Sequence, residues 1–150
     1  MNSDTFRLRI FIASPLETVW EAWTSPAALG KWFVEAHHDG KFLPGMNYRW
    51  VWANGGEETG EVFESNEPVR LAFTFGPDAG VEVTLAPFEG RVAVDLRQTQ
   101  SHRDSEARAA FAQDCRQGWT FYLTNLKAWL EHGVDLRESQ APELSDLVNV

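Results

Sequence analysis

The stretch YRWVWANGG, residues 48–56, places Tyr48, Trp50 and Trp52 on alternate positions. Alternate residues of a β-strand share a face, so this stretch predicts a strand with three large aromatic rings on one side. The Asn54-Gly55 pair that follows is a turn signal. Two of the rings carry an indole N–H, which needs a hydrogen-bond partner when it is buried. The rings therefore belong either to a solid core or to the floor of a cavity that holds a guest.

The strand pattern continues on both sides of this stretch. Short apolar runs separated by turn-forming pairs such as Asp39-Gly40 and Pro44-Gly45 extend from about residue 34 to residue 100. They predict six strands, of which the weakest lies near residues 37–43. The alternating segment FRLRIFI at 6–12 predicts a seventh strand. Their tight spacing favours an antiparallel meander.

Helical signals flank the strands. The sequence SPLE at 14–17 predicts an N-cap, a proline at the first helical position and a capping box. Ser25-Pro26 predicts the start of a second short helix. After residue 100 an apolar stripe predicts one long helix that begins at Asp104 or Ser105 and stops at Gly133. Gly118 within it costs about 1 kcal/mol relative to alanine, which predicts a close contact or a bend there.

The predicted order is β-α-α-β-β-β-β-β-β-α. This is an α+β helix-grip fold, in which a curved seven-stranded antiparallel sheet carries two short helices and one long C-terminal helix. That helix, about 40 Å long, is the only predicted element that can cover the apolar face of the sheet. We expect one domain over residues 5–133, followed by an acidic, loosely docked tail at 134–150.

Composition narrows the classes of partner. The 150 residues include 13 basic and 22 acidic side chains, a net charge of −9, which argues against nucleic acid as a partner. No apolar run is long enough to cross a membrane or to serve as a secretion signal, and the single cysteine suits a reducing compartment. We therefore expect a cytoplasmic protein. Neither the His and Cys spacings nor any glycine-rich motif predicts a metal or another cofactor.

Several segments together resemble a known family. SPLETVWEAWTSPAALGKWF, PGMNYRWVW, GEVFESNEPVRLAFTF and GWTFYLTNLKAWLEHG are similar, in this order, to motifs of the Aha1-type domain. This domain is named for the activator of the ninety-kilodalton heat-shock protein ATPase and belongs to the START and birch-pollen-allergen-like helix-grip superfamily. The resemblance covers about residues 6 to 133. It implies the fold above and, for the wider superfamily, a cavity that binds small apolar ligands.

The strand and helix positions that this resemblance implies predict an aromatic and aliphatic lining for such a cavity, between the sheet and the long helix. The candidate ligand-binding residues are Trp32, Tyr48, Trp50, Trp52, Val62, Phe73, Phe75, Leu85, Val94, Trp119, Tyr122 and Leu123. Inward aromatic residues also form ordinary cores, so the same list describes a filled interior equally well. Cys115, on the apolar stripe of the helix, is expected to be a small buried hydrophobe.

Three functions follow from this pattern. The one we favour is the binding of a small apolar or aromatic ligand without chemistry. The alternative is a cyclase-like or hydrolase-like enzyme that uses an inward Tyr48, Tyr122 or Glu64 as acid or base. Glu64 shares the parity of Val62, which would point it inward, although pairing with Arg49 or Arg70 is the favoured expectation. The third is an interaction module that stimulates a chaperone ATPase, and a homodimer remains open.

Overall fold

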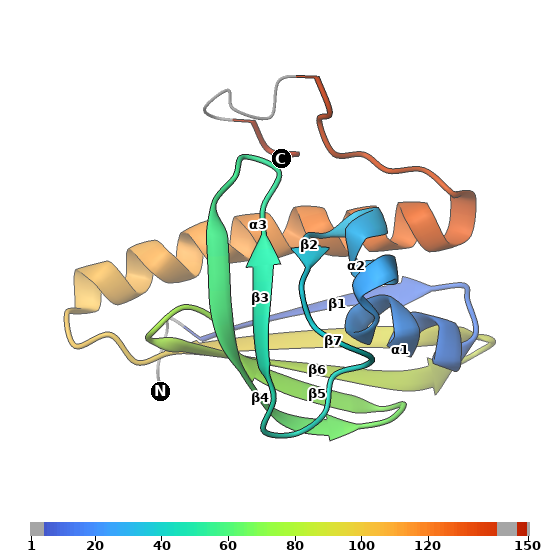
Figure 1. Ribbon diagram of the computed structural model, residues 1–150, viewed down its shortest axis with the longest axis horizontal. Coiled ribbons are helices and arrows are strands. Elements are labelled where there is room, and N and C mark those ends of the chain that lie inside the picture. The colour runs from blue at the N-terminus through green and yellow to red at the C-terminus, as the bar shows by residue number, and fades with distance from the viewer. Residues whose placement is uncertain (1–4, 141–146, 150) are drawn as a thin grey trace.

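The computed structural model describes residues 5–140 and 147–149. It contains a seven-stranded antiparallel sheet and three helices in the predicted order, which confirms the α+β helix-grip fold (Figure 1). The elements are β1 (Phe6–Ile12), α1 (Leu16–Thr24), α2 (Pro26–Trp32), β2 (Glu35–Ala36), β3 (Asn47–Val51), β4 (Glu57–Asn66), β5 (Arg70–Thr74), β6 (Ala79–Phe88), β7 (Arg91–Gln100) and α3 (Ser105–His132).

The strands form a meander that the first strand completes at one edge. Their order is β1-β7-β6-β5-β4-β3-β2, so β1 pairs with the last strand and β2 forms the opposite edge. The long α3 runs along one face of the sheet, and the two short helices lie near its C-terminal half (Figure 1). Helix α3 contacts β1 and β7, α1 contacts β6, and α2 contacts the edge strand β2.

The boundaries differ from the prediction at two places. Helix α1 begins at Leu16, because Pro15 occupies the N-cap position and no side chain caps the helix, so the predicted capping box is absent. Strand β2 comprises only Glu35 and Ala36, instead of a strand near residues 37–43. The segment after it turns inward as a loop, with His38 bonded to the Thr24 carbonyl at 2.9 Å and stacked on a phenylalanine.

The ends of α3 match the expected chemistry. The Asp104 carboxylate accepts the Ala107 N–H at 3.0 Å, which satisfies one of the free donors at the start of the helix. Gly133 ends the helix in the left-handed region at φ 67°, a conformation that glycine adopts without steric cost. The cap at Asp104 and the stop at Gly133, both predicted from the sequence, thus define the two ends of α3.

The first two rings of the 48–56 stretch lie in a solid core. Tyr48 and Trp50 have ring centroids 4.1 Å apart, and Trp50 meets Phe73 edge-on at 5.4 Å. Gly60 stands directly across from Tyr48 in the ladder, and a Cβ there would lie 2.4 Å from the tyrosine ring. The Tyr48 hydroxyl donates to the Thr74 carbonyl at 2.6 Å. These contacts fill the space between the two rings and their neighbours on the inner face of the sheet.

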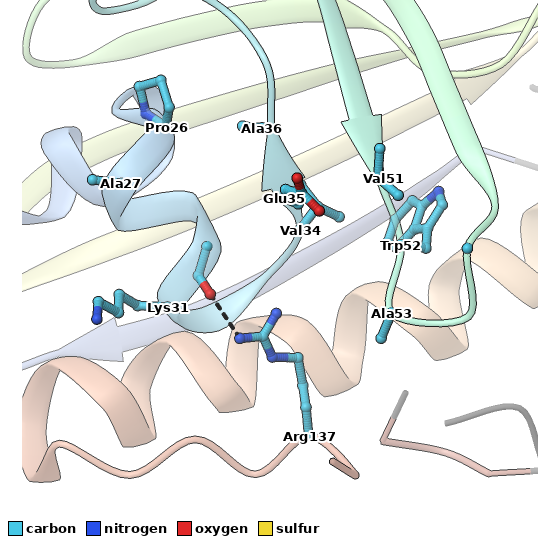
Figure 2. Close-up of a pocket in the computed structure, with 12 residues that line it drawn as sticks. Pro26, Ala27, Lys31, Val34, Glu35, Ala36, Val51, Trp52, Ala53 and Arg137 are labelled. Carbon is cyan, nitrogen blue, oxygen red and sulfur yellow. Dashed lines mark hydrogen bonds between the residues drawn. The ribbon is translucent and has the colours of Figure 1, made fainter. Parts of the chain in front are cut away.

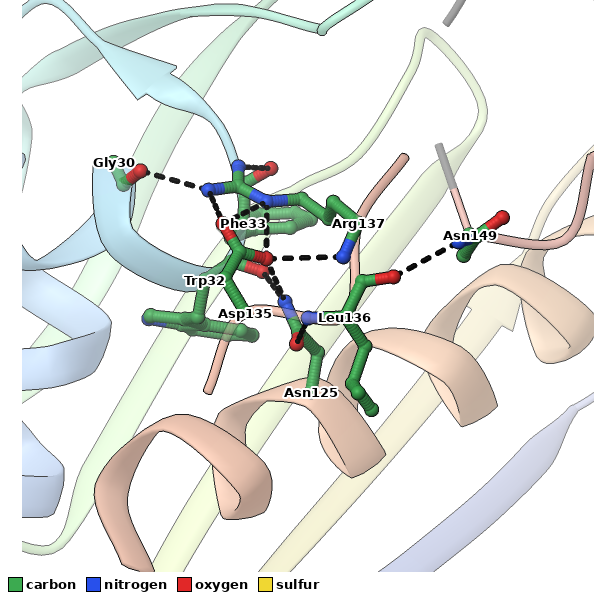
Figure 3. A network of polar contacts seen from close by, with 8 residues as sticks. All are labelled: Gly30, Trp32, Phe33, Asn125, Asp135, Leu136, Arg137 and Asn149. Atoms are coloured by element: carbon green, nitrogen blue, oxygen red, sulfur yellow. Dashed lines mark hydrogen bonds and ion pairs between the residues drawn. The ribbon is translucent and has the colours of Figure 1, made fainter. Parts of the chain in front are cut away.

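The chain after α3 folds back onto the short helices. Asn125, fully buried on α3, donates to the Trp32 carbonyl at 2.8 Å and accepts the Leu136 N–H at 2.7 Å (Figure 3). Arg137 pairs with Asp135 at 2.8 Å. Residues 135–137 are therefore firmly anchored, in contrast to the loosely docked tail that we expected. Residues 141–146 and 150 lie outside the described part of the chain, so for them the expectation stays a prediction.

Candidate functional site

An apolar pocket of about 260 Å³ lies at the other end of the aromatic stripe, between α3 and the strands β3 and β5. Six of its nine lining residues are aromatic. The lining comprises Phe33, Trp52, Phe75, Phe111, Asp114, Cys115, Gly118, Trp119 and Tyr122. An apolar cavity of roughly 150 Å³ accommodates benzene, so this volume is suited to a molecule with one or two rings.

The walls of the pocket are aromatic rings in contact with one another. Phe33 is central: its ring lies 5.2 Å from Trp52, 4.8 Å from Tyr122 and 5.2 Å from Trp119. Phe75 closes the sheet side, 5.4 Å from Trp119. Phe33, Trp119 and Tyr122 are buried, whereas Trp52 and Phe75 are only half-buried. The pocket is therefore rigid at its base and open towards solvent.

Gly118 contributes the open side of the pocket. A Cβ built on this residue would meet no atom within 4 Å, so the close contact that we predicted here is absent. A glycine inside a helix costs about 1 kcal/mol of helix stability relative to alanine, and no packing requirement explains it here. What the glycine does provide is space, because any larger side chain would project into the pocket or its mouth.

The base of the pocket is fixed by hydrogen bonds to neighbouring elements. Arg137 donates to the carbonyls of Phe33 at 3.0 Å and of Gly30 at 2.9 Å (Figure 3). These carbonyls lie at the C-terminal end of α2, where helix geometry leaves them without partners. On the opposite side the Trp119 indole donates to Gln98 Oε1 at 2.8 Å. Phe33 and Trp119 are thereby held in place before any ligand arrives.

The thiol and the phenol of the pocket are neutral groups. Burial raises the pKa of Cys115, so this side chain remains a thiol at neutral pH. Burial also raises the pKa of Tyr122 to about 12. Tyr48 lies outside the pocket lining, and its pKa is raised too, first by burial and then by the nearby Glu58 carboxylate. Neither tyrosine is poised to lose a proton, which weighs against a tyrosine base.

Of the predicted ligand-binding residues, the structure brings four together around the pocket, namely Trp52, Phe75, Trp119 and Tyr122. The others are buried in the core and do not line it: Trp32, Tyr48, Trp50, Val62, Phe73, Leu85, Val94 and Leu123. Both sets are buried or half-buried, and the ligand-binding role assigned to them stays a prediction. The two sets differ in whether side chains of α3 and α2 fill the space opposite them.

Sequence reasoning missed five residues of the lining. They are Phe33, Phe111, Asp114, Cys115 and Gly118. Phe111, Cys115, Trp119 and Tyr122 follow one another at helical spacing, so the α3 stripe was itself the signal for the first two. The glycine in the middle of that stripe was the strongest available sign of an opening.

The inward orientation considered for Glu64 is wrong. A β-bulge shifts the register between Val62, which faces Phe73, and Glu64, which faces Ala72. Consecutive residues of β5 point to opposite faces, so the extra residue moves Glu64 to the outer face. There it forms an ion pair with Arg70, the favoured alternative. Glu64 is therefore remote from the pocket, and the geometry gives its acid or base role no support.

A different carboxylate, Glu58, approaches the pocket from β4. It lies opposite Trp50 in the ladder and therefore on the inner face of the sheet. One of its oxygens accepts the Gly76 N–H. Burial raises the pKa of Glu58, an effect that this hydrogen bond partly offsets. No basic side chain pairs with Glu58 among the described residues.

Two surface grooves of about 660 Å³ each are larger but less enclosed. One lies between α2 and the end of β3, with Lys31, Glu35, Trp52 and Arg137 on its walls (Figure 2). The guanidinium of Arg137, its most prominent polar group, is already occupied by Asp135 and two carbonyls. The other groove runs along β3 and β4 beside Tyr48. Neither groove is enclosed by aromatic rings as the 260 Å³ pocket is.

Among the described residues, no three side chains of His, Cys, Asp or Glu type gather in a metal-binding arrangement. Within the same ranges, no helix has the length and apolar character needed to cross a membrane.

Comparisons with known proteins agree with this fold. Residues 13–131 match the family model described as Activator of Hsp90 ATPase homolog 1-like protein. No curated protein matches the chain.

Solved structures share the architecture. The protein SSP2350 from Staphylococcus saprophyticus is 20% identical with a TM-score of 0.77, and the match covers 90% of this chain and 97% of that one. The Aha1 dimer from Colwellia psychrerythraea is 20% identical, with a TM-score of 0.73 and coverage of 86% and 97%. DynU16, a putative protein of the dynemicin biosynthetic locus, is 24% identical at a TM-score of 0.73, with coverage of 87% and 48%.

At these identities the solved structures establish the fold alone. The family model goes further, because it spans most of the chain, from the start of α1 almost to the end of α3. The chain belongs to the family described as Activator of Hsp90 ATPase homolog 1-like protein.

Proposed function

We propose that the protein binds a small aromatic or apolar molecule in the 260 Å³ pocket between α3, β3 and β5. The observation that carries this proposal is Gly118, a glycine inside a helix whose missing side chain leaves the pocket open. The aromatic lining and its fixed base support it, because preorganised rings bind a guest without a large ordering cost. Ligand binding of this kind requires no catalytic acid or base.

The proposal is tested by closing the pocket from its open side. Calorimetric titration with 3-ethylindole, a neutral bicyclic probe, should give a dissociation constant on the order of 0.1 mM for the wild type, given the usual free energy per ligand atom. Gly118→Leu should abolish binding while the protein stays folded, because the new side chain has room. Gln117→Leu adds the same side chain to the neighbouring, exposed position and should bind as the wild type does.

Two results would contradict the proposal. If the wild type does not bind 3-ethylindole or a panel of similar one- and two-ring probes, the pocket has no such role. If Gly118→Leu and Gln117→Leu bind equally well, the probe occupies another site. Thermal denaturation of each variant establishes that loss of binding is not loss of folding.

The family name supplies a second candidate, stimulation of a chaperone ATPase. It is separated from ligand binding by an ATPase assay with the ninety-kilodalton chaperone of the same cell. Stimulation that Gly118→Leu leaves unchanged would assign the activity to the protein surface. Absence of stimulation at saturating protein would leave ligand binding as the function to pursue.

A further inference from the structure

The pocket carries negative charge and no matching positive charge. Asp114, an exposed residue, is the only Asp, Glu, Lys, Arg or His of the lining, and burial raises the pKa values of Cys115 and Tyr122, so these two groups stay neutral at neutral pH. In the described part of the chain, Asp114 has neither an ion pair nor a hydrogen bond from its side chain. A carboxylate at the edge of an aromatic pocket is therefore unused within the protein.

A second carboxylate reaches the same end of the pocket. Glu58 on β4 and Phe111 on α3 converge at Gly76: a Cβ there would lie 3.9 Å from a Glu58 oxygen and 3.4 Å from Phe111 Cζ. Phe111 is part of the lining, so the Glu58 carboxylate lies near this wall of the pocket. Glu58 and Asp114 both raise the pKa of Cys115, which places both charges within electrostatic range of the pocket wall.

The nearby cations are committed elsewhere. Arg137 is bonded to Asp135 and to two carbonyls at the base of the pocket. Arg108 donates to the His102 carbonyl at 2.7 Å. Arg116 lies over the Phe6 ring at 5.9 Å. The net charge of −9 adds a field that attracts cations to the whole surface.

The His102 imidazole is the remaining titratable group at this end. Its ring lies 5.0 Å from Phe111, and its Nε2 is 3.9 Å from Asp78.

We propose that the preferred ligand is an aromatic amine, whose rings occupy the pocket and whose ammonium group lies beside the Asp114 carboxylate, where the nearby Glu58 carboxylate adds to the attraction. This inference rests on the proposed function and adds the charge of the ligand to it. The ring faces of Trp52 and Phe75 stabilise the same ammonium through cation–π attraction. Aromatic carboxylic acids, which are the common alternative, would meet only repulsion at this end.

The test compares three probes with the same indole ring at pH 8: tryptamine as the cation, 3-ethylindole as the neutral compound and indole-3-propionate as the anion. Tryptamine should bind about five-fold or more tightly than 3-ethylindole, and the anion more weakly than both. Raising the NaCl concentration should reduce the advantage of tryptamine and leave 3-ethylindole unchanged.

Matched variants assign the effect to residues. Asp114→Asn and Glu58→Gln keep the shape of each side chain and should each bring tryptamine closer to the affinity of 3-ethylindole. Glu61→Gln is the control, because it removes a charge from the same strand as Glu58 but from an exposed position on the opposite face of the sheet. This variant should bind tryptamine as the wild type does.

The outcomes separate the two proposals. If the neutral and cationic probes bind equally, or the anion binds best, the charge inference is overturned and the apolar pocket stands. If none of the probes binds, both are overturned. If tryptamine retains its advantage in the double variant Asp114→Asn/Glu58→Gln, the ammonium lies elsewhere and the inference fails.

Discussion

The two ends of the aromatic stripe on β3 have the same chemistry and opposite surroundings. At one end Trp50 is 1% exposed, and its ring is enclosed by Tyr48, Phe42 and Phe73. At the other end Trp52 is half-buried and faces a pocket. The difference teaches that the pocket is made by what lies opposite the strand, a glycine on α3 instead of a packed side chain.

Removing one ring from each end of the stripe should give the largest measurable difference between the two ends. Trp50→Ala should destabilise the protein by about 3–5 kcal/mol, because it leaves a cavity in a closed core. Trp52→Ala should cost only roughly 1–2 kcal/mol, since the ring is already partly exposed, yet it should weaken 3-ethylindole binding strongly. Chemical denaturation and calorimetry measure the two effects. Equal stability losses would mean that the two ends do not differ.

The two inward glycines offer the next test. Gly60→Ala should destabilise by roughly 1–3 kcal/mol, because the new methyl group would lie 2.4 Å from the Tyr48 ring and from Thr74 Oγ1. Equilibrium unfolding in urea gives the value. The double variant Gly60→Ala/Tyr48→Phe is the control, and it should show nearly the same loss because the ring remains. A neutral Gly60→Ala would show that the core at this end is not closed.

Gly118→Ala should have the opposite sign. Its Cβ meets no atom within 4 Å, so the substitution should stabilise the protein by about 0.5–1 kcal/mol through helix propensity. The rise in the urea midpoint measures this gain. A loss of stability would instead indicate that the helix needs glycine at this point for packing.

The smallest expected effect concerns Glu58 and its pH dependence. Burial raises its pKa above the ordinary 4.5, so its contribution to stability is fully present at acidic pH and declines as pH rises through the raised pKa. Glu58→Gln removes this decline. The difference in melting temperature, Glu58→Gln minus wild type, should therefore be more positive at pH 7.5 than at pH 4. Tyr48 and Cys115, the other titratable groups near Glu58, ionise above this range.

Glu61→Gln is the control for that series. It lies on the same strand at an exposed position, so its melting temperature relative to wild type should change little between the two pH values. If Glu58→Gln instead loses stability towards pH 7.5, the Glu58 carboxylate is stabilised in the native state, and it is not free to receive a cation.

Much of the fold could be predicted because it depends on local patterns. The period-2 alternation at 48–52, the Asp104 cap and the Gly133 stop are short-range signals whose physical meaning does not depend on the rest of the chain. The face of each inward residue followed from the same periodicity. These signals are sufficient for the element order and for the apolar face that the long helix covers.

The set of residues that line the pocket could not be predicted from local patterns, because it depends on contacts between residues far apart in the sequence. The β-bulge after Val62 reversed the parity that pointed Glu64 inward and left Glu58 as the inner carboxylate. Phe33 lines the pocket, and its carbonyl accepts a hydrogen bond from Arg137, 104 residues later in the chain. Gly118 was noticed for its helix cost, but its role as an opening depends on which residues of β3 and β5 lie opposite.

The most direct test of this account is a two-dimensional nitrogen-15 NMR titration of the seven tryptophan indole N–H signals with 3-ethylindole. The indole of Trp52 and that of Trp119, which donates to Gln98, should shift with the probe, because both rings line the pocket. The indole of Trp50, inside the closed core, should stay in place. Unchanged Trp52 and Trp119 signals, or a shift centred on Trp50, would contradict the division into a packed end and an open end.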